Sequence, residues 1–294
     1  MAAERGVVPV PTSPVVAAWE LALRLRQRRD ELGIEVKTIT QRLGFTRNYW
    51  SAVENERKIL SEENLINLVE LFEYDEEERQ ELLELRAAAK GRAWWMSYSG
   101  VLSSELQRLI GLEAGARRVR YYESVLIPGL LQTVDYAKAL MIPSVTEPRV
   151  EVDHRVEVRL LRQQYLTGDN PLHMTAIISE AALRQEIGGP EVYRAQLEHL
   201  AQTIESHPDN IEVRVVPFTA TWCGLFGAAT THLIDFANPR LPTVAWQESV
   251  TTRAIIDDPD LVRDIAATYN DALGRALSKS NSLELIHRRI KELD

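Results

Sequence analysis

The chain has 294 residues, which is long for one domain and predicts two domains of unequal size. Its hydrophobic fraction of 45% and charged fraction of 26% are those of an ordinary globular protein, and the single cysteine, Cys223, excludes an intramolecular disulfide and a cysteine-rich metal site. The net charge is −9, but nine basic and five acidic residues lie between positions 21 and 60, followed by two basic and ten acidic residues between 61 and 86. A basic segment beside an acidic one fits nucleic acid binding and equally fits solvated helix surfaces.

The chain carries no targeting or membrane signal that we recognise. The N-terminal residues, MAAERGVVPVPTSP, lack the basic start and apolar run of a signal peptide. No apolar stretch approaches the roughly 20 residues that span a bilayer. We therefore expect a soluble, cytoplasmic protein without a membrane partner.

Capping residues and apolar spacing predict the first two helices. Ser13 is a good N-cap and Pro14 a good first helical residue, because proline has no N–H to lose there. Gly33 is a natural end for this helix. A second, short helix is predicted from Val36 to Leu43, and Gly44 ends it.

A third helix is predicted to begin at Thr46 and to have two different sides. Trp50 and Val53 lie three residues apart and should pack against the second helix, whereas Arg47 and Asn48 face outward. Two short helices joined by a glycine turn, the second with a polar first turn, are typical of a helix-turn-helix that enters the major groove. The same residues also fit an ordinary helical hairpin whose arginine and asparagine are only solvated.

The DNA-binding interpretation gives each polar residue type a chemical role. Arginine can bridge guanine O6 and N7, asparagine can bridge adenine N6 and N7, and lysines and arginines beyond the helix neutralise phosphates. The predicted DNA-contacting residues are Lys37, Gln41, Arg42, Thr46, Arg47, Asn48, Tyr49, Ser51, Arg57 and Lys58.

Two more helices complete an all-α domain over residues 14–90. Ser61 caps the fourth helix, whose first turn is acidic, and the fifth runs from Asp75 to Ala89. The acidic run at 75–78 should face away from DNA, because it would repel phosphates. Residues 91–100 are predicted to be a linker, in which Trp94 and Trp95 either anchor a domain junction or offer a stacking platform for bases.

Residues 101–280 predict a larger, mixed domain, so that the fold class of the whole chain is α+β. Helices are expected at 102–109, 135–141, 150–166, 180–185, 192–204 and 258–277, and strands at 174–178, 211–217, 231–236 and 243–246. In the helix at 150–166, Arg155, Arg159 and Arg162 are expected on the outer side, where they contact DNA or pair with acidic residues. A charged helix is expected within residues 281–294.

Signatures of catalysis are missing from the sequence. The six histidines show no HExxH spacing, and neither a GxSxG elbow nor a Walker loop occurs. Cys223 precedes Gly224 and could be a nucleophile at a turn, but a buried small thiol is the favoured interpretation. We expect no enzymatic activity, no cofactor and no metal.

Residues 19–72 resemble the Xre, or lambda-repressor-like, helix-turn-helix family. The residues that carry this resemblance are Gly33, Leu43-Gly44, Thr46-Arg47, Val53-Glu54-Asn55, Leu65, Leu68 and Leu71. It implies a five-helix lambda-repressor-like domain. Where the family usually has Thr-Gln, this chain has Glu35 and Val36, so the contact to the DNA backbone must come from Lys37 or Arg42.

The larger region is similar to the C-terminal domain of many actinobacterial regulators, a group that includes WhiJ-like proteins. The matching residues are Gly111-Leu112-Glu113, Tyr122-Glu123, Leu126 to Thr133, Asp135-Tyr136-Ala137, Arg159, Arg162-Gln163, Glu180 to Arg184, Gly188-Gly189-Pro190, Val215 to Phe218 and Glu248. Members of this group are described as antitoxin-like and are often encoded beside a very small partner protein.

These observations predict a sequence-specific, DNA-binding transcriptional regulator that acts as a homodimer through residues after about 98. The alternative is an antitoxin-like protein whose main act is to bind a small partner protein. The turn at 126–133 is a candidate docking surface for that partner, through Tyr122, Glu123, Gln132 and Tyr136. The same turn also fits a purely structural role, as a carrier of core leucines.

Overall fold

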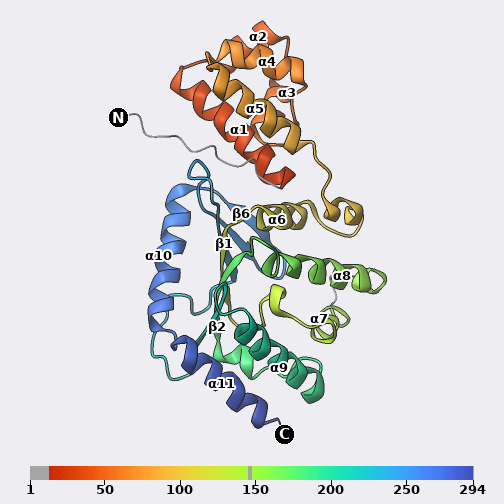
Figure 1. The fold of residues 1–294 in the computed structure, drawn as a ribbon, viewed down its shortest axis with the longest axis vertical. Coiled ribbons are helices and arrows are strands. Elements are labelled where there is room, and N and C mark those ends of the chain that lie inside the picture. The colour runs from red at the N-terminus through yellow and green to blue at the C-terminus, as the bar shows by residue number, and fades with distance from the viewer. Residues whose placement is uncertain (1–12, 145–147, 294) are drawn as a thin grey trace. The chain divides into compact units, whose positions relative to one another are not determined.

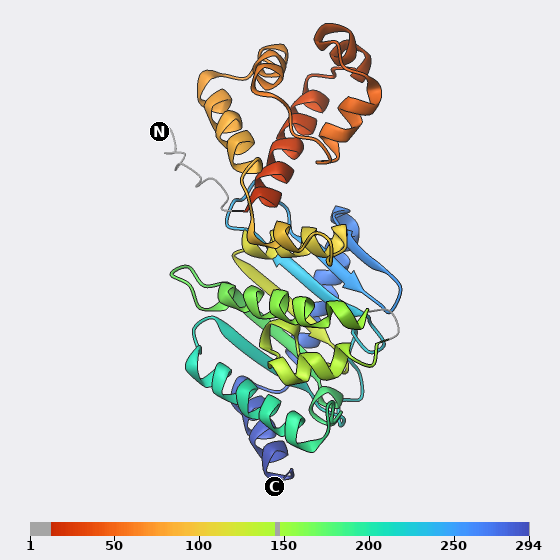
Figure 2. The same ribbon diagram turned by 90° about the vertical axis from the view of Figure 1, so that its right-hand side faces the viewer.

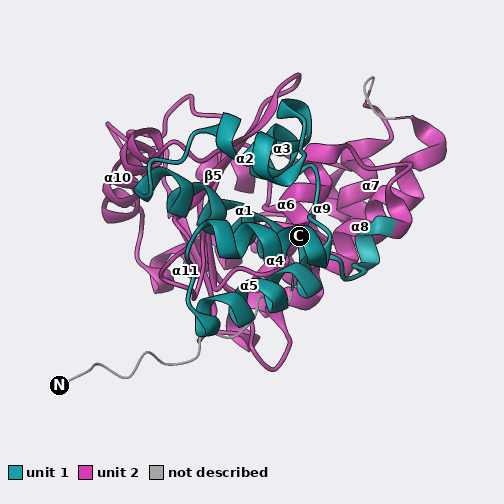
Figure 3. Cartoon of the chain, turned by 90° about the horizontal axis from the view of Figure 1, so that it is seen from above, with its two compact units in different colours: residues 1–96 teal, residues 97–294 magenta. Residues whose placement is uncertain are grey.

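The computed structural model describes residues 13–144 and 148–293. The chain forms two compact units, residues 1–96 and residues 97–294 (Figure 1, Figure 3). We predict that the N-terminal segment is not a signal peptide. Residues 1–12 of this segment lie outside the described residues. Within the described ranges, no helix is both long and apolar enough to cross a membrane.

Five α-helices build the first unit. They are α1 (Pro14–Glu31), α2 (Val36–Leu43), α3 (Arg47–Glu54), α4 (Glu62–Leu71) and α5 (Glu76–Ala89), and the short 3-10 helix η1 (Trp94–Tyr98) follows them. The bounds of α2 are those predicted. Gly44 ends α2 because its φ of 67° lies in the left-handed region, which glycine enters without a steric penalty.

Side-chain caps start three of these helices. The hydroxyls of Thr46 and Ser61 accept hydrogen bonds from backbone N–H groups in the first turns of α3 and α4, as predicted. Asp75 caps α5 in a capping box with Glu78, in which each side chain accepts from the other residue's backbone N–H. Ser13 precedes α1 as expected, but its side chain makes no capping hydrogen bond.

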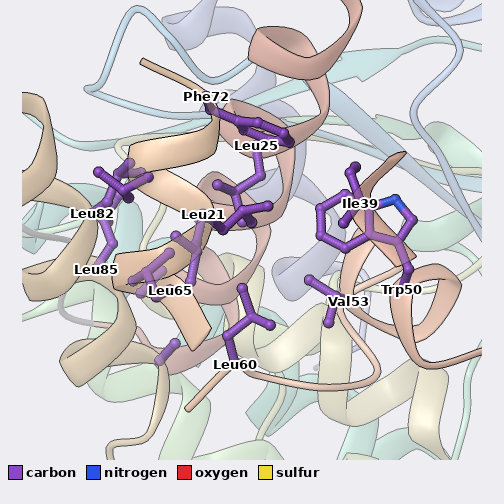
Figure 4. Close-up of a cluster of buried hydrophobic side chains, with 14 residues drawn as sticks. Leu21, Leu25, Ile39, Trp50, Val53, Leu60, Leu65, Phe72, Leu82 and Leu85 are labelled. Carbon is purple, nitrogen blue, oxygen red and sulfur yellow. The ribbon is translucent and has the colours of Figure 1, made fainter. Parts of the chain in front are cut away.

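The core of the first unit joins all five helices (Figure 4). Trp50 and Val53 of α3 lie buried in it, as predicted, and so does Ile39 of α2. The Trp50 ring meets the Phe72 ring edge to face, with 6.4 Å between centroids. The other labelled side chains of this cluster are Leu21, Leu25, Leu60, Leu65, Leu82 and Leu85.

A six-stranded mixed sheet forms the middle of the second unit. Its strands follow the order β3-β2-β1-β4-β5-β6. They are β1 (Arg118–Glu123), β2 (His173–Ser179), β3 (Ile211–Val216), β4 (Thr230–Asp235), β5 (Val244–Glu248) and β6 (Arg253–Ile256). β1 pairs in parallel with β2 and antiparallel with β4, so the two directions meet at this strand. Four strands match the predicted ones, whereas β1 and β6 were not predicted.

Helices cover both faces of this sheet (Figure 1, Figure 2). On one side lie α6 (Ser104–Ala114), α7 (Val134–Met141), α8 (Val152–Gln163) and α9 (Pro190–Ser206), and on the other lies α10 (Pro259–Arg275). The segment predicted as one helix at 150–166 is α8 flanked by the 3-10 turns η3 (Arg149–Glu151) and η4 (Gln164–Leu166). The segment predicted as a helix at 180–185 is the 3-10 helix η5 (Glu180–Leu183).

The charged C-terminal helix, α11 (Lys279–Lys291), packs against α9 and β3 and is therefore part of the second unit. Its buried residues include Leu285 and Ile286. The protein thus combines an all-α helix-turn-helix unit with a larger α+β unit, which confirms the predicted fold class.

Candidate nucleic-acid interface

The helix-turn-helix of the first unit consists of α2, a three-residue turn and α3. The inward residues of both helices are fixed by the core, because Ile39, Trp50 and Val53 are each less than 5% exposed. The remaining side of α3 therefore faces outward. Thr46 orders the first turn of this helix, since its hydroxyl accepts a 3.1 Å hydrogen bond from the backbone N–H of Tyr49.

Nine of the ten predicted DNA-contacting residues are exposed. They are Lys37, Gln41, Arg42, Thr46, Arg47, Asn48, Ser51, Arg57 and Lys58. They belong to α2, to the turn before α3, to α3 itself and to the loop that follows it. Arg47 and Asn48 occupy the first turn of α3, which is the part of a recognition helix that reaches base edges.

Several of these basic residues have no charged partner in the protein. Lys37, Arg42, Arg47 and Arg57 make no ion pair with any residue in 13–144 or 148–293. Other arginines of the same unit are neutralised: the Arg86 guanidinium, for example, lies 3.2 Å from the carboxylate of Glu62. Exposed cations without counter-charges on the protein attract phosphates.

Tyr49 differs from the other nine residues because it is half-buried. Its ring packs on Phe45, with 4.7 Å between centroids, and the Lys58 ammonium lies 4.8 Å from the centre of the same ring. The tyrosine therefore holds Lys58 beside the first turn of α3. Tyr49 is predicted on the outer side of α3, but it faces outward only in part, because its ring packs on Phe45.

An ion pair that sequence reasoning missed ties α3 to α1. The Arg29 guanidinium lies 2.9 Å from the Glu54 carboxylate, and both side chains are less than 20% exposed. This contact fixes the end of α3 that lies away from the polar first turn. The two residues are 25 positions apart, so helical spacing gives no sign that they meet.

Comparison with protein-family models gives two matches. Residues 20–82 match a helix-turn-helix domain, which indicates DNA binding. Residues 106–288 match a domain of unknown function, DUF5753, and this match covers more than half of the chain. The chain belongs to the DUF5753 family. Comparison with curated proteins and with solved structures gives no match.

In the DUF5753 domain, the candidate docking surface for a partner protein is buried. Tyr122, Glu123, Gln132 and Tyr136 are each at most 6% exposed. The expectation of an exposed docking surface is contradicted, because all four side chains are buried and those of Glu123, Gln132 and Tyr136 have hydrogen-bond partners inside the protein. Gln132 Nε2 donates to the Ile127 carbonyl at 2.6 Å, and the Tyr136 hydroxyl accepts from the Ile127 N–H at 3.2 Å. The turn at 126–133 is thus a structural one.

Two of the three arginines of α8 that are expected on its outer side are paired with carboxylates of the DUF5753 domain. Arg162 is buried and makes two hydrogen bonds with the Glu113 carboxylate, at 2.8 and 2.9 Å. Arg155 pairs with Glu151 at 3.0 Å, as one predicted alternative had it. The outward orientation predicted for Arg162 is wrong, because α6 supplies a buried carboxylate that the local sequence pattern does not reveal.

Cys223 is buried in the hydrophobic cluster that also contains Tyr122 and Tyr269. A thiol that is 1% exposed is poorly placed to attack a substrate, so the favoured interpretation of a small buried residue holds. Among the described residues, no group of three or more His, Cys, Asp and Glu side chains lies close enough together to hold a metal ion.

Proposed function

We propose that this protein is a sequence-specific DNA-binding regulator of transcription, which reads the major groove with the first turn of α3. In this proposal Arg47 and Asn48 contact base edges, and Lys37, Arg42, Arg57 and Lys58 contact phosphates. The protein acts in the cytoplasm by binding and not by catalysis. The finer family assignment, to Xre-type regulators of the WhiJ-like group, is part of the same proposal.

The observation that carries this proposal is the set of exposed basic residues without ion pairs around α3. Four of them lack a carboxylate partner among the described residues, although the chain as a whole has nine more acidic than basic residues. Exposed cations gathered on one surface create a local positive potential that attracts anions. A duplex with its two rows of phosphates is the anion that fits a helix-turn-helix.

We further propose that the protein binds DNA as a homodimer assembled through the second unit. One helix-turn-helix covers only one half-site, and regulators of this type reach their specific affinities by binding paired half-sites with twofold symmetry. The selected DNA sites should then contain two copies of one short motif. Light scattering that shows a monomer both free and on such a site would remove this part of the proposal.

The test of the DNA-binding proposal is selection of bound duplexes from a random pool by the full-length chain. The affinity for the selected site is then measured by fluorescence anisotropy. Arg47→Ala should weaken binding by roughly tenfold or more and relax the preference at one base pair. Arg79→Ala is the matched control, because Arg79 pairs with Glu76 on the acidic helix α5.

The outcomes separate cleanly. Enrichment of one motif with loss of affinity in Arg47→Ala alone supports the proposal. Failure to enrich any motif, or equal affinities of Arg47→Ala and Arg79→Ala for the selected site, would contradict it. Because the buried residues of the turn at 126–133 give no support to partner docking, we do not propose an antitoxin role.

A further inference from the structure

A cavity of about 830 Å³ lies in the second unit between the sheet and helices α6, α7 and α8. Its volume is within the range of pockets that hold drug-sized ligands. Every residue that lines it belongs to the second unit, so the cavity does not depend on the helix-turn-helix. Nothing in the DNA-binding proposal uses it.

One wall of the cavity is apolar. It consists of apolar side chains from α6, α7 and α8, from the residues just before α6 and from the loop after β1. The residues are Leu102, Leu106, Leu109, Val125, Leu126, Ile127, Leu140, Met141 and Val158. This wall can bury the hydrocarbon part of a ligand, which is the main source of affinity for small molecules in such sites.

The opposite wall carries a row of polar side chains that crosses the sheet. Thr230 of β4 donates a 2.7 Å hydrogen bond to Glu123 of β1, and it stands opposite Glu248 of β5. Glu248 in turn stands opposite Arg253 of β6 and accepts a 2.6 Å hydrogen bond from it. Four strands therefore each contribute one polar group to the same side of the cavity.

His232 lies next to this row and has an unsatisfied ring nitrogen. It stands opposite Tyr121 in the β1–β4 pairing, and the centroids of the two rings are 3.9 Å apart. The side chain is 5% exposed, and within the described residues its Nδ1 has no hydrogen-bond partner. A buried polar atom without a partner destabilises the empty protein, so a ligand that hydrogen-bonds to it gains affinity.

Three of the four arginines that line the cavity are paired with carboxylates of the protein. Arg155 pairs with Glu151, Arg162 with Glu113 and Arg253 with Glu248, whereas Arg159 Nη1 donates a hydrogen bond to the neutral side-chain amide oxygen of Gln132. Burial raises the pKa of Glu123 to about 8, so its carboxyl is mostly protonated at pH 7 and can donate a hydrogen bond. Burial also lowers the pKa of His232, which keeps this ring neutral.

We propose that this cavity binds an uncharged, largely apolar small molecule whose hydroxyl or carbonyl group hydrogen-bonds to Glu123 and His232. An apolar wall, a neutral pair of hydrogen-bonding groups and three arginines that are already paired with carboxylates all favour such a ligand over an ion. The inference goes beyond DNA binding and stands without it. It gives the second unit a ligand-binding role.

The test uses Nile red, an uncharged dye with a carbonyl group, and the anionic dye 1-anilinonaphthalene-8-sulfonate. Both are titrated into the full-length chain, with dye fluorescence as the readout. Nile red should bind saturably at one site, and more tightly than the anionic dye. His232→Phe keeps the aromatic ring beside Tyr121 but removes the ring nitrogens, and it should weaken Nile red binding several-fold, as the loss of one hydrogen bond does.

Two further variants control this experiment. Leu106→Trp narrows the cavity from its apolar wall and should also weaken binding of Nile red. Phe218→Ser removes an apolar side chain that is 62% exposed and does not line the cavity, and it should leave binding unchanged. Far-UV circular dichroism and the melting temperature establish that each variant is folded.

Three results would overturn the inference. One is the absence of saturable Nile red binding to the wild-type protein. A second is equal binding by wild type, His232→Phe and Leu106→Trp, or loss of binding in Phe218→Ser, because the dye would then bind elsewhere. The third is tighter binding of the anionic dye that His232→Phe and Leu106→Trp both weaken, since the site would then be one for anions.

Discussion

Arg162 of α8 and Glu113 of α6 form a buried ion pair with two hydrogen bonds, from Nε to Oε2 at 2.9 Å and from Nη2 to Oε1 at 2.8 Å. The Tyr121 hydroxyl donates a third hydrogen bond to the same carboxylate at 2.8 Å. The pair therefore connects two helices to β1, the central strand of the sheet. Both charges are removed from water, so the burial of each one is compensated only while the other is present.

Removing one member of this pair should destabilise the second unit strongly. Arg162→Ala leaves the Glu113 carboxylate buried without a cation, which costs about 3–5 kcal/mol of unfolding free energy. Urea denaturation of the full chain measures this. Arg263→Ala is the control, because Arg263 pairs with Asp260 on the surface, with both side chains more than 60% exposed, and should change the transition little. Equal midpoints for the two variants would show that the buried pair is dispensable.

Truncation of Trp50 should disable the helix-turn-helix without touching its polar surface. Trp50 of α3 is 1% exposed and packs against the Phe72 ring, so Trp50→Ala opens a large cavity and costs about 3–5 kcal/mol. The variant should lose helical far-UV circular dichroism at lower urea concentration and bind the selected DNA weakly. Ser51→Ala, at the next position on the exposed side, should stay within about 0.5 kcal/mol of wild type. A Trp50→Ala protein with wild-type stability would refute the role of this residue as the anchor of α3.

The basic loop after α3 should set the salt dependence of DNA binding. If Lys58 and Arg57 each neutralise one phosphate, replacement of either by alanine lowers the slope of log K against log salt concentration by about 0.9. Anisotropy titrations over a series of salt concentrations give this slope. Lys90→Ala, which removes an exposed lysine after α5, is expected to leave it unchanged. Unaltered slopes in both loop variants would mean that the loop does not touch the DNA backbone.

Stability of the second unit should fall as the pH rises from about 4.5 to about 8. Burial is the main cause that raises the pKa of Glu123 from 4.5 to about 8, the nearby Glu248 adds to it, and Thr230 and Arg159 act against it. The folded state then holds a proton that the unfolded state releases in this range, so unfolding becomes more favourable with rising pH. Glu123→Gln should remove this fall in unfolding free energy, because glutamine does not titrate in this range. The variant should therefore be more stable than wild type at pH 8 but not at pH 4.5. Parallel stability curves for the two proteins would contradict the shift.

The first unit was largely predictable from sequence because its signals are local. Gly44 ends α2, Thr46 caps α3, and Trp50 and Val53 mark the inner side of α3 by their spacing. Each of these features acts within a few residues. The exposed residues of the candidate interface follow from the same geometry, since whatever does not face the core faces water.

The second unit was less predictable because distant residues decide how its polar side chains are used. The sequence predicts Gln132 and Tyr136 at the surface because it does not show that the backbone of Ile127 hydrogen-bonds to both. It predicts Arg162 on the outer side because its partner, Glu113, lies 49 positions earlier in the chain. The cavity has the same origin. Its walls come from segments spread between residues 102 and 253, so no single motif could reveal it.

The mixed pairing of β1 also sets an order of events during synthesis. Arg118 pairs with His173 on β2 and with Asp235 on β4, which emerge from the ribosome 55 and 117 residues later. β1 therefore cannot pair on both sides until most of the second unit has been synthesised. Pairing between strands so far apart in the sequence is slow. The first unit ends at residue 96 and is built from helices, so it can fold while the strands that complete the sheet are still being translated. A nascent chain would thus display a finished helix-turn-helix before the second unit has closed around its cavity.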